Sequence, residues 1–265
     1  LAPAAQAGTP AGAAFLKIDT GARATALGGA YTAVSDDVTS LRYNPAGLSR
    51  IEKRELGATH SQWLLDTRFD FIGFAQPTSR GTFALGMTRL AVGTIEGRDS
   101  QRQLTSDFKA SDTAYALGFG RSIDNLIPGG KTHLGASLKY IDSKIGSDSA
   151  STLALDLGGI HRLSARPLDL GVSVLNIGNG VKFIDQTDPL PLTLSLGAAY
   201  RLTKTLNLAL DVKQSVPDEH TSVGLGAEYS VLSGFTLRAG YASAGGADSS
   251  LGGLSGGFGV RLADY

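Results

Sequence analysis

Residues 21–50 read GARATALGGAYTAVSDDVTSLRYNPAGLSR and differ from the rest of the chain. This is the only long region whose apolar residues do not alternate with polar ones. It ends in Asn44-Pro45-Ala46-Gly47, a stiff turn. From about Arg54 onward one pattern recurs, in which about ten alternating residues are followed by a polar break. A compact non-strand segment followed by many two-faced strands predicts a plug followed by a barrel.

The composition of the plug segment suits a narrow space. Ala and Gly are frequent between residues 22 and 30, and such small residues allow tight packing inside a lumen. Asp36 and Asp37, after Ser35, offer N-caps for a short helix over residues 38–43. Pro45 ends that helix and biases Asn44 towards an extended conformation. We therefore expect residues 8–53 to form an N-terminal helical plug.

The overall composition excludes several classes of protein. The chain has 265 residues, 24 basic and 24 acidic, so it offers no long-range field for nucleic acid. Charged residues make up only 18%, below the usual share, and Gly is abundant at 35 residues. Cys is absent, which excludes disulfides, thiolate metal sites and Cys nucleophiles. A protein whose outer face meets lipid needs few charges.

Period-two alternation divides the remainder of the chain into strands. In one segment Leu153, Leu155 and Leu157 point one way, and Ala154 and Asp156 point the other. The predicted fold is all-β, an antiparallel transmembrane β-barrel over residues 54–265 with about twelve strands visible. The predicted strands are 54–63, 66–76, 81–93, 112–122, 131–142, 151–163, 167–176, 191–202, 204–214, 219–230, 234–242 and 252–263.

A soluble β-sandwich also alternates, but three features favour a membrane barrel. No apolar run reaches the ~20 residues of a membrane helix, whereas strands of ~10 residues can span an outer membrane. Breaks between strands alternate between mostly short and mostly long, as expected of periplasmic turns and extracellular loops. Aromatic residues lie near strand ends, where an interfacial girdle forms. The girdle candidates are Trp63, Tyr140, Tyr200, Tyr229 and Tyr241.

The two ends of the sequence carry separate expectations. Ala5-Gln6-Ala7 fits the small-x-small rule of signal-peptidase sites, so residues 1–7 are either a signal-peptide remnant or a flexible leader. The last segment loses its alternation at Ala263-Asp264. Because this is a poor closing strand, we expect the intact barrel to have a further hairpin and about fourteen strands.

The plug segment resembles the N-terminal signature of PorV/PorQ-type outer-membrane proteins, within the superfamily of the long-chain fatty-acid transporter FadL. Asn44-Pro45-Ala46 is similar to the Asn-Pro-Ala plug motif of that superfamily, and Asp36-Asp37 with Gly47 complete the candidate plug motif. Residues 28–34, 181–185 with 189–191, and 238–241 are similar to the PorV/PorQ pattern. The resemblance covers essentially the whole chain and implies a fourteen-stranded barrel in the bacterial outer membrane.

Two functions follow from this resemblance. PorV-like barrels are accessories of secretion or surface assembly that bind partner proteins, and the charged inner strand faces favour this role. FadL-like barrels instead carry hydrophobic small molecules passively across the outer membrane, which predicts a hydrophobic ligand. Both roles imply contact with outer-membrane lipid, and neither is enzymatic. A sealed, polar lumen would favour the accessory, and an apolar pocket beside the plug would favour the transporter.

The sequence carries no pattern typical of catalysis. His60, His133, His161 and His220 lack metal-ligand spacing, and no nucleophile elbow or phosphate-binding loop with its Lys is present. We expect no metal and no cofactor. Strand carboxylates such as Asp156, Asp169 and Asp211 are expected to pair with lumen Arg or Lys. Candidate partner-binding residues on two long loops are Arg98, Gln103, Phe108, Val181 and Phe183. The alternative for residues 97–112 is a solvated loop, and the alternative for Val181 and Phe183 is packing over the mouth of the barrel.

Overall fold

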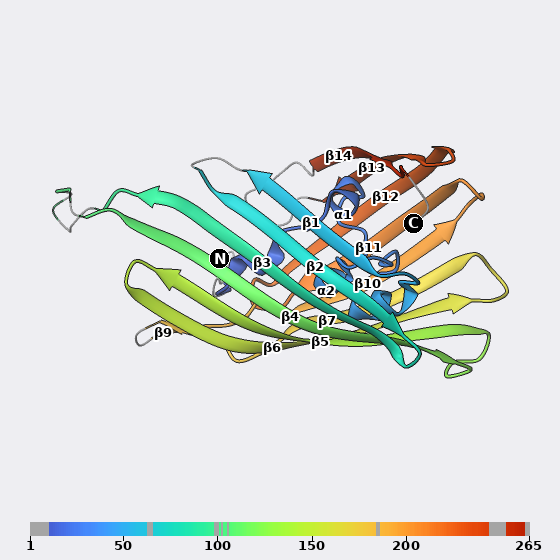
Figure 1. The fold of residues 1–265 in the computed structure, drawn as a ribbon, viewed down its shortest axis with the longest axis horizontal. Coiled ribbons are helices and arrows are strands. Elements are labelled where there is room, and N and C mark those ends of the chain that lie inside the picture. Colours follow the sequence, from blue (N-terminus) through green and yellow to red (C-terminus); the bar gives the residue numbers. More distant parts are fainter. Residues whose placement is uncertain are drawn as a thin grey trace, which may run out of the picture.

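A computed structural model describes residues 11–62, 66–97, 101, 103–104, 106–183, 186–243 and 253–262. Within these residues a long β-sheet curves around four short N-terminal helices (Figure 1). The strands are β1 Glu55–Gln62, β2 Arg68–Thr78, β3 Gly81–Ile95, β4 Phe108–Asp124, β5 Gly130–Ile145, β6 Asp148–Leu163, β7 Leu168–Gly178, β8 Val181–Phe183, β9 Gln186–Asp188, β10 Thr193–Arg201, β11 Leu206–Ser215, β12 His220–Leu232, β13 Phe235–Ala242 and β14 Gly253–Val260.

Twelve of these strands form one sheet in the order β1 to β7 followed by β10 to β14. Each strand pairs antiparallel with its neighbour, and β8 and β9 form a separate two-stranded hairpin. Strands β1 and β14 are the edges, and no ladder joins them among the described residues. Each predicted segment corresponds to one strand of the sheet, so the expected antiparallel fold is confirmed. The expected closing hairpin stays a prediction.

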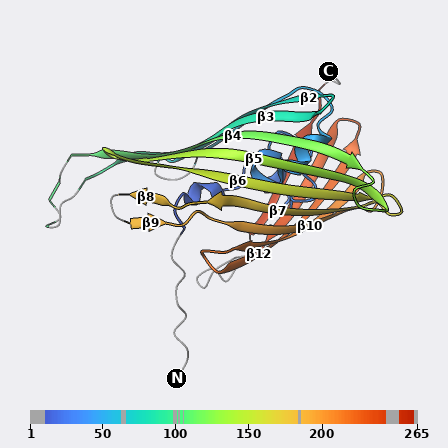
Figure 2. The ribbon, with the colours of Figure 1, turned by 90° about the horizontal axis from the view of Figure 1, so that it is seen from below.

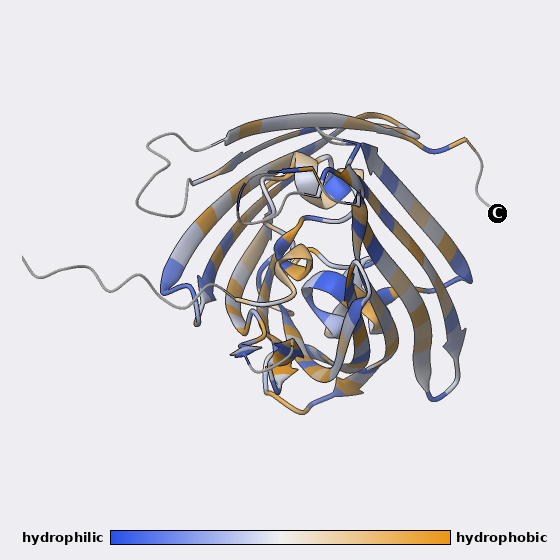
Figure 3. Ribbon diagram, turned by 90° about the vertical axis from the view of Figure 1, so that its left-hand side faces the viewer, coloured by the Kyte–Doolittle hydropathy of each residue, from blue (hydrophilic) through white to orange (hydrophobic). Residues whose placement is uncertain are grey.

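Apolar side chains alternate outward along the strands. Leu153 is 56% exposed and Leu196 is 65% exposed, although both lie within long strands. Their neighbours on the inner face are buried, as Asp156 at 0% demonstrates. A soluble sandwich buries its apolar face, and this sheet exposes it. Figure 3 shows the helices lying within the curve of the sheet.

The N-terminal helices fill the space that the sheet encloses. They comprise two 3-10 helices, η1 Ala14–Lys17 and η2 Pro45–Arg50, and two α-helices, α1 Ala22–Ala26 and α2 Ser40–Tyr43. Helix η2 packs against β3 to β6, whereas α1 packs against β13 and β14. Seen from below, the helices lie beside the inner face of the sheet over much of its width (Figure 2). We call residues 11–53 the plug.

Glycines on the inner faces of the strands let the plug backbone approach. A Cβ at Gly135 would lie 2.2 Å from the carbonyl carbon of Pro45. A Cβ at Gly158 would lie 1.9 Å from Oδ1 of Asn44. Both distances are far below a van der Waals contact, so only glycine fits at these two positions.

Three details differ from the sequence-based expectations. Strand β4 begins at Phe108, so the predicted loop of residues 97–112 is shorter than expected. Strand β5 ends at Ile145 and strand β6 begins at Asp148, so the expected loop of residues 143–150 is a two-residue turn. The connection between β7 and β10 contains the hairpin β8–β9, which is too short for alternation to reveal.

Candidate functional site

Asn44 joins the plug to the wall of the barrel. Its conformation is extended, with φ −159° and ψ 104°, as Pro45 requires. The side chain is fully buried, and Nδ2 donates to the carbonyl oxygens of Thr32 at 2.8 Å, Gly159 at 3.2 Å and Val172 at 3.2 Å. Oδ1 accepts from the N–H of Ala46 at 3.1 Å. Because Gly159 and Val172 are paired across β6 and β7, one amide binds two strands and the plug.

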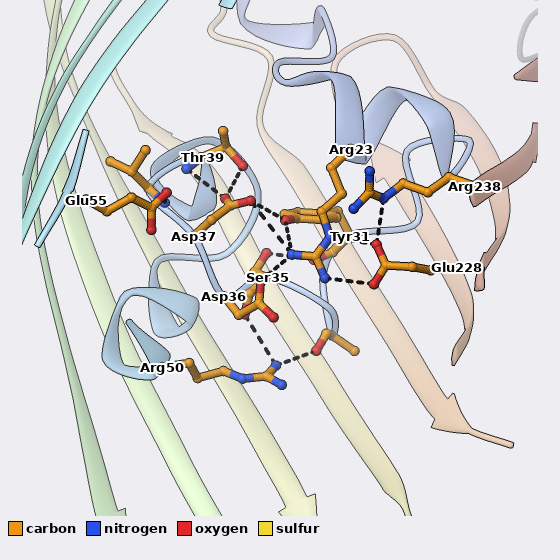
Figure 4. A network of polar contacts seen from close by, with 12 residues as sticks. Arg23, Tyr31, Ser35, Asp36, Asp37, Thr39, Arg50, Glu55, Glu228 and Arg238 are labelled. Atoms are coloured by element: carbon orange, nitrogen blue, oxygen red, sulfur yellow. Dashed lines mark hydrogen bonds and ion pairs between the residues drawn. The ribbon is translucent and has the colours of Figure 1, made fainter. Parts of the chain in front are cut away.

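The two acidic residues of the predicted motif organise a polar network inside the plug (Figure 4). Asp36 binds Arg23, whose guanidinium also reaches Glu228 on β12 with Nε–Oε2 at 2.9 Å. Asp37 accepts from the hydroxyl of Tyr31 at 2.6 Å and from the N–H of Thr39 at 2.9 Å. Helix α2 begins at Ser40, later than expected, and its N-cap residue Thr39 makes no side-chain cap hydrogen bond, whereas Asp37 accepts from the N–H of Thr39 in the preceding turn. Arg238 also binds Glu228, at 2.6 Å.

A single carboxylate on the wall holds the middle of the plug. Oδ2 of Asp211, on β11, accepts from the N–H of Tyr31 at 2.9 Å, the N–H of Thr32 at 2.8 Å and Oγ1 of Thr32 at 2.7 Å. Asp211 is 1% exposed. Sequence reasoning expected an Arg or Lys partner here, and the structure instead gives it backbone N–H groups of the plug. We call residues 31–34 the pinned segment.

A cavity of about 230 Å³ lies on one side of the pinned segment. It is near the end of the barrel that carries the β3–β4, β7–β10 and β13–β14 connections, which we call the loop end. Thr32, Tyr43 and Ile18 line it from the plug, and Leu175 and Ser195 line it from the wall. The cavity therefore lies between the plug and strands β7, β10, β11 and β12.

Charged plug residues around the loop-end cavity are satisfied within the protein. Burial lowers the pKa of Arg42, whose NH2 nevertheless donates to the carbonyl of Leu16 at 2.8 Å. Burial, with Asp19 adding to it, raises the pKa of Tyr43 well above its usual range, so its hydroxyl stays protonated. That hydroxyl donates to the carbonyl of Thr20 at 3.0 Å. Nζ of Lys213 lies 5.4 Å from the centre of the Tyr43 ring.

A second cavity, of about 280 Å³, lies on the opposite side of the pinned segment. Ala33 and Val34 line it from the plug, one residue after Thr32, which lines the first cavity. Its wall residues lie near the opposite end of the barrel, which carries the β6–β7 and β10–β11 connections and which we call the turn end. Its lining is strongly charged. The pinned segment thus separates two cavities, and neither could be predicted from local sequence.

The predicted loop residues differ in their surroundings. Val181 is 1% exposed, because it packs with Phe15, Ile141 and Leu190, and Phe183 packs partly buried against the same cluster. Of the two alternatives for these residues, the structure favours packing over the mouth of the barrel by the β8–β9 hairpin. Phe108 is half-buried in β4, and Gln103 is exposed. Arg98 lies outside the described residues.

Four of the five predicted girdle aromatics lie on the outer face. Tyr140, Tyr200, Tyr229 and Tyr241 are between 39% and 47% exposed. Tyr200 and Tyr229 are near the turn end of the barrel, and Tyr241 is near the loop end. Trp63 lies outside the described residues. Tyr140 is paired with Tyr115, a further exposed aromatic that was not predicted.

Among the described residues, no three His, Cys, Asp or Glu side chains group as metal ligands would. In that same part of the chain, none of the helices has the length and apolar character needed to cross a membrane.

Comparison with known proteins identifies the fold. Residues 6–116, less than half of the chain, match an uncharacterised protein family, UPF0164. The structure is similar to the monoaromatic hydrocarbon channel CymD, with TM-score 0.63 and 14% identity over 92% of this chain and 89% of that one. It is similar to the Ralstonia pickettii toluene transporter TbuX, with TM-score 0.62 and 13% identity over 92% and 90%. A Pseudomonas aeruginosa FadL homologue gives TM-score 0.52 and 12% identity over 83% and 78%. No curated protein sequence matches.

These likenesses establish the FadL-like outer-membrane β-barrel fold and leave the PorV/PorQ branch unconfirmed. The outer-membrane location follows from this fold together with the exposed apolar belt on the strands. The chain is therefore an outer-membrane β-barrel protein.

Proposed function

We propose that this barrel is a non-enzymatic, passive channel for small hydrophobic molecules, and that the pinned segment is its gate. The observation that carries the proposal is the pair of cavities on opposite sides of residues 31–34. Movement of that short segment away from Asp211 would join them into one path along the wall. The proposed barrel domain comprises residues 54–265. The proposed N-terminal plug domain comprises residues 8–53, of which the structure describes 11–53.

The size of the loop-end cavity supports this class of cargo. Its volume of about 230 Å³ exceeds the ~150 Å³ of an engineered apolar cavity that binds benzene. Leu16, Ile18 and Leu175 supply apolar contact area, and the Tyr43 ring adds a flat surface. This volume is sufficient for a single-ring hydrocarbon.

The fold neighbours support a channel more than a secretion accessory. CymD is a monoaromatic hydrocarbon channel and TbuX is a toluene transporter, and both share this fold at low identity. The charged inner faces of the strands predict a protein-binding accessory. Their charges, however, are largely used to hold the plug, as Asp211 and Glu228 are. The packing of Val181 and Phe183 against the cluster of Phe15 weakens the accessory role further.

The test is uptake of radiolabelled toluene by cells that express the protein in an outer membrane lacking other hydrocarbon channels. Ser195→Trp places the largest side chain into the loop-end cavity from β10. The neighbouring Leu194→Trp is the matched control, because Leu194 is 44% exposed on the outer face. We expect protein-dependent uptake to be lost in Ser195→Trp and retained in Leu194→Trp.

Two results would contradict the channel. One is uptake that does not depend on expression of the wild-type protein. The other is equal uptake by the two Trp variants when both show the same heat-modifiable migration on detergent gels, since folding would then be intact while the cavity is blocked.

A further inference from the structure

Three arginines converge on one buried carboxylate in the turn-end cavity. Asp169, on β7, is 1% exposed. It receives Arg162 in a two-point contact, with Nε–Oδ1 and NH2–Oδ2 both at 3.1 Å. NH2 of Arg50, from the plug, lies 3.0 Å from Oδ2, and NH1 of Arg201, from β10, lies 3.4 Å from both oxygens.

This cluster carries more positive charge than its own acid can balance. Three guanidinium groups on one carboxylate leave a surplus of two positive charges. The other two acids that line the cavity, Asp36 and Glu228, both bind Arg23 and so offset its charge and one further positive charge. Lys204 adds another cation, so the lining as a whole has five basic and three acidic side chains and a surplus of two positive charges. Like charges held this close repel one another, so a further anion would stabilise the cluster.

The arginines remain accessible from the cavity. The side chains of Arg162 and Arg201 are 42% and 40% exposed, although they touch a carboxylate that is almost completely buried. Arg201 makes only long contacts, so much of its hydrogen-bonding capacity is directed elsewhere. The cavity of about 280 Å³ has room for a tetrahedral oxyanion beside them.

We propose that the turn-end cavity is a binding site for a phosphate-type dianion, held by Arg162, Arg201 and Lys204. Guanidinium forks match phosphate oxygens in two-point geometry. A dianion balances the surplus of two charges, whereas a monocarboxylate balances half of it. The phosphate group is either free or part of a lipid headgroup, and both present the same oxygens.

This site shares the turn-end cavity with the proposed path, but its test does not depend on passage of a hydrocarbon. Its residues lie on the opposite side of the pinned segment from the loop-end cavity, and none of the three proposed ligands lines that cavity. Absence of toluene uptake would not contradict the anion site, and absence of phosphate binding would not contradict the channel.

The test is calorimetric titration of the detergent-solubilised full chain with inorganic phosphate, at low ionic strength and about pH 8, where phosphate is a dianion. The variant Arg162→Gln with Arg201→Gln removes both exposed guanidinium groups. We expect saturable binding by the wild type and about tenfold weakening for each guanidinium lost, since each supplies charge-assisted hydrogen bonds. Arg80→Gln is the matched control, because Arg80 is an exposed arginine in the β2–β3 turn outside the cavity.

Absence of saturable binding by the wild type would overturn the proposal, as would equal binding by the double variant and the control. Acetate that competes as strongly as phosphate would overturn the dianion assignment. Dihexanoyl phosphatidic acid separates the two sources, because tighter binding than inorganic phosphate supports a lipid headgroup and weaker binding supports free phosphate.

A single variant guards against misfolding. If the double variant loses heat-modifiable migration, Arg201→Gln alone replaces it, because Arg201 makes the longest contacts to Asp169 and contributes least to holding it. About tenfold weaker phosphate binding by this variant supports the site. Unchanged binding would overturn it.

Discussion

Asp211→Ala is the sharpest test of how the plug is held. The substitution removes the acceptor of three hydrogen bonds, two from the N–H groups of Tyr31 and Thr32 and one from Oγ1 of Thr32. Hydrogen bonds to a charged group contribute about 1.5–3 kcal/mol each. The gross loss is therefore about 5 kcal/mol or more. Relief from burying the carboxylate offsets part of it, which leaves a net destabilisation of about 3 kcal/mol.

This loss falls on the pinned segment and not on the sheet, because the Asp211 backbone remains paired with β10 and β12. A local opening that is easier by about 3 kcal/mol speeds amide exchange more than a hundredfold. Hydrogen–deuterium exchange of a peptide spanning residues 27–36 measures this directly. The control is Asp70→Ala, which removes the exposed His60–Asp70 pair on β1 and β2, worth at most about 1 kcal/mol.

Unchanged protection of the Tyr31 and Thr32 amides in Asp211→Ala would refute this reasoning. So would equal acceleration in Asp70→Ala, because the effect would then be general. Asp211→Asn retains an acceptor oxygen without the charge, so its exchange should lie between that of the wild type and that of Asp211→Ala.

Three further predictions concern the plug, the lipid face and the loop end. Gly158→Ala puts a Cβ within 1.9 Å of Asn44 Oδ1, so we expect faster exchange at residues 44–46, whereas Gly146→Ala, in an open turn, should leave it unchanged. Leu196→Arg places a charge in the lipid-facing belt and should destabilise the folded barrel by about 2–4 kcal/mol in bilayer refolding assays, against little change for Leu202→Arg beyond the strand end. Burial raises the pKa of Asp218, but hydrogen bonds from Ser215, Lys17 and the Ala11 N–H outweigh this effect and hold the pKa below its usual range. The stability that ionised Asp218 gives to residues 11–17 is present above the ordinary carboxylate pKa and is lost as the pH falls through the lowered pKa. We therefore expect the amides of residues 11–17 to exchange faster in acid. In Asp218→Asn this acid response should disappear.

Local patterns were sufficient to predict the wall of the barrel. Alternation requires only neighbouring residues, and it correctly divided Leu153 and Leu155 from Ala154 and Asp156 before any pairing was known. The position of the plug followed from the break in that alternation. The extended conformation of Asn44 followed from the steric effect of Pro45 on the residue before it.

Contacts between distant parts of the chain could not be predicted this way. Val181 lies in a predicted loop among polar neighbours, a pattern that gives no sign of burial. It is buried because η1 and the β8–β9 hairpin meet over the mouth of the barrel. The Asp169 cluster needs arginines from the plug, β6 and β10, which alternation places on the inner face without fixing their register to one another. Asp211 was expected to pair with a cation, because backbone donors of a remote segment leave no signal in sequence.

The plug contacts have a consequence for the order in which the protein assembles. Tyr31 and Asp211 are separated by 180 residues, and Arg23 and Glu228 by 205. The plug therefore cannot satisfy its buried N–H groups and charges until strands far along the chain, β11 and β12, are in place. Contacts of such long sequence separation pay their loop-closure entropy before they contribute stability, which slows folding. Strands β11 and β12 thus hold the plug as well as extending the sheet, so we expect the plug and these strands to become ordered in the same late kinetic phase.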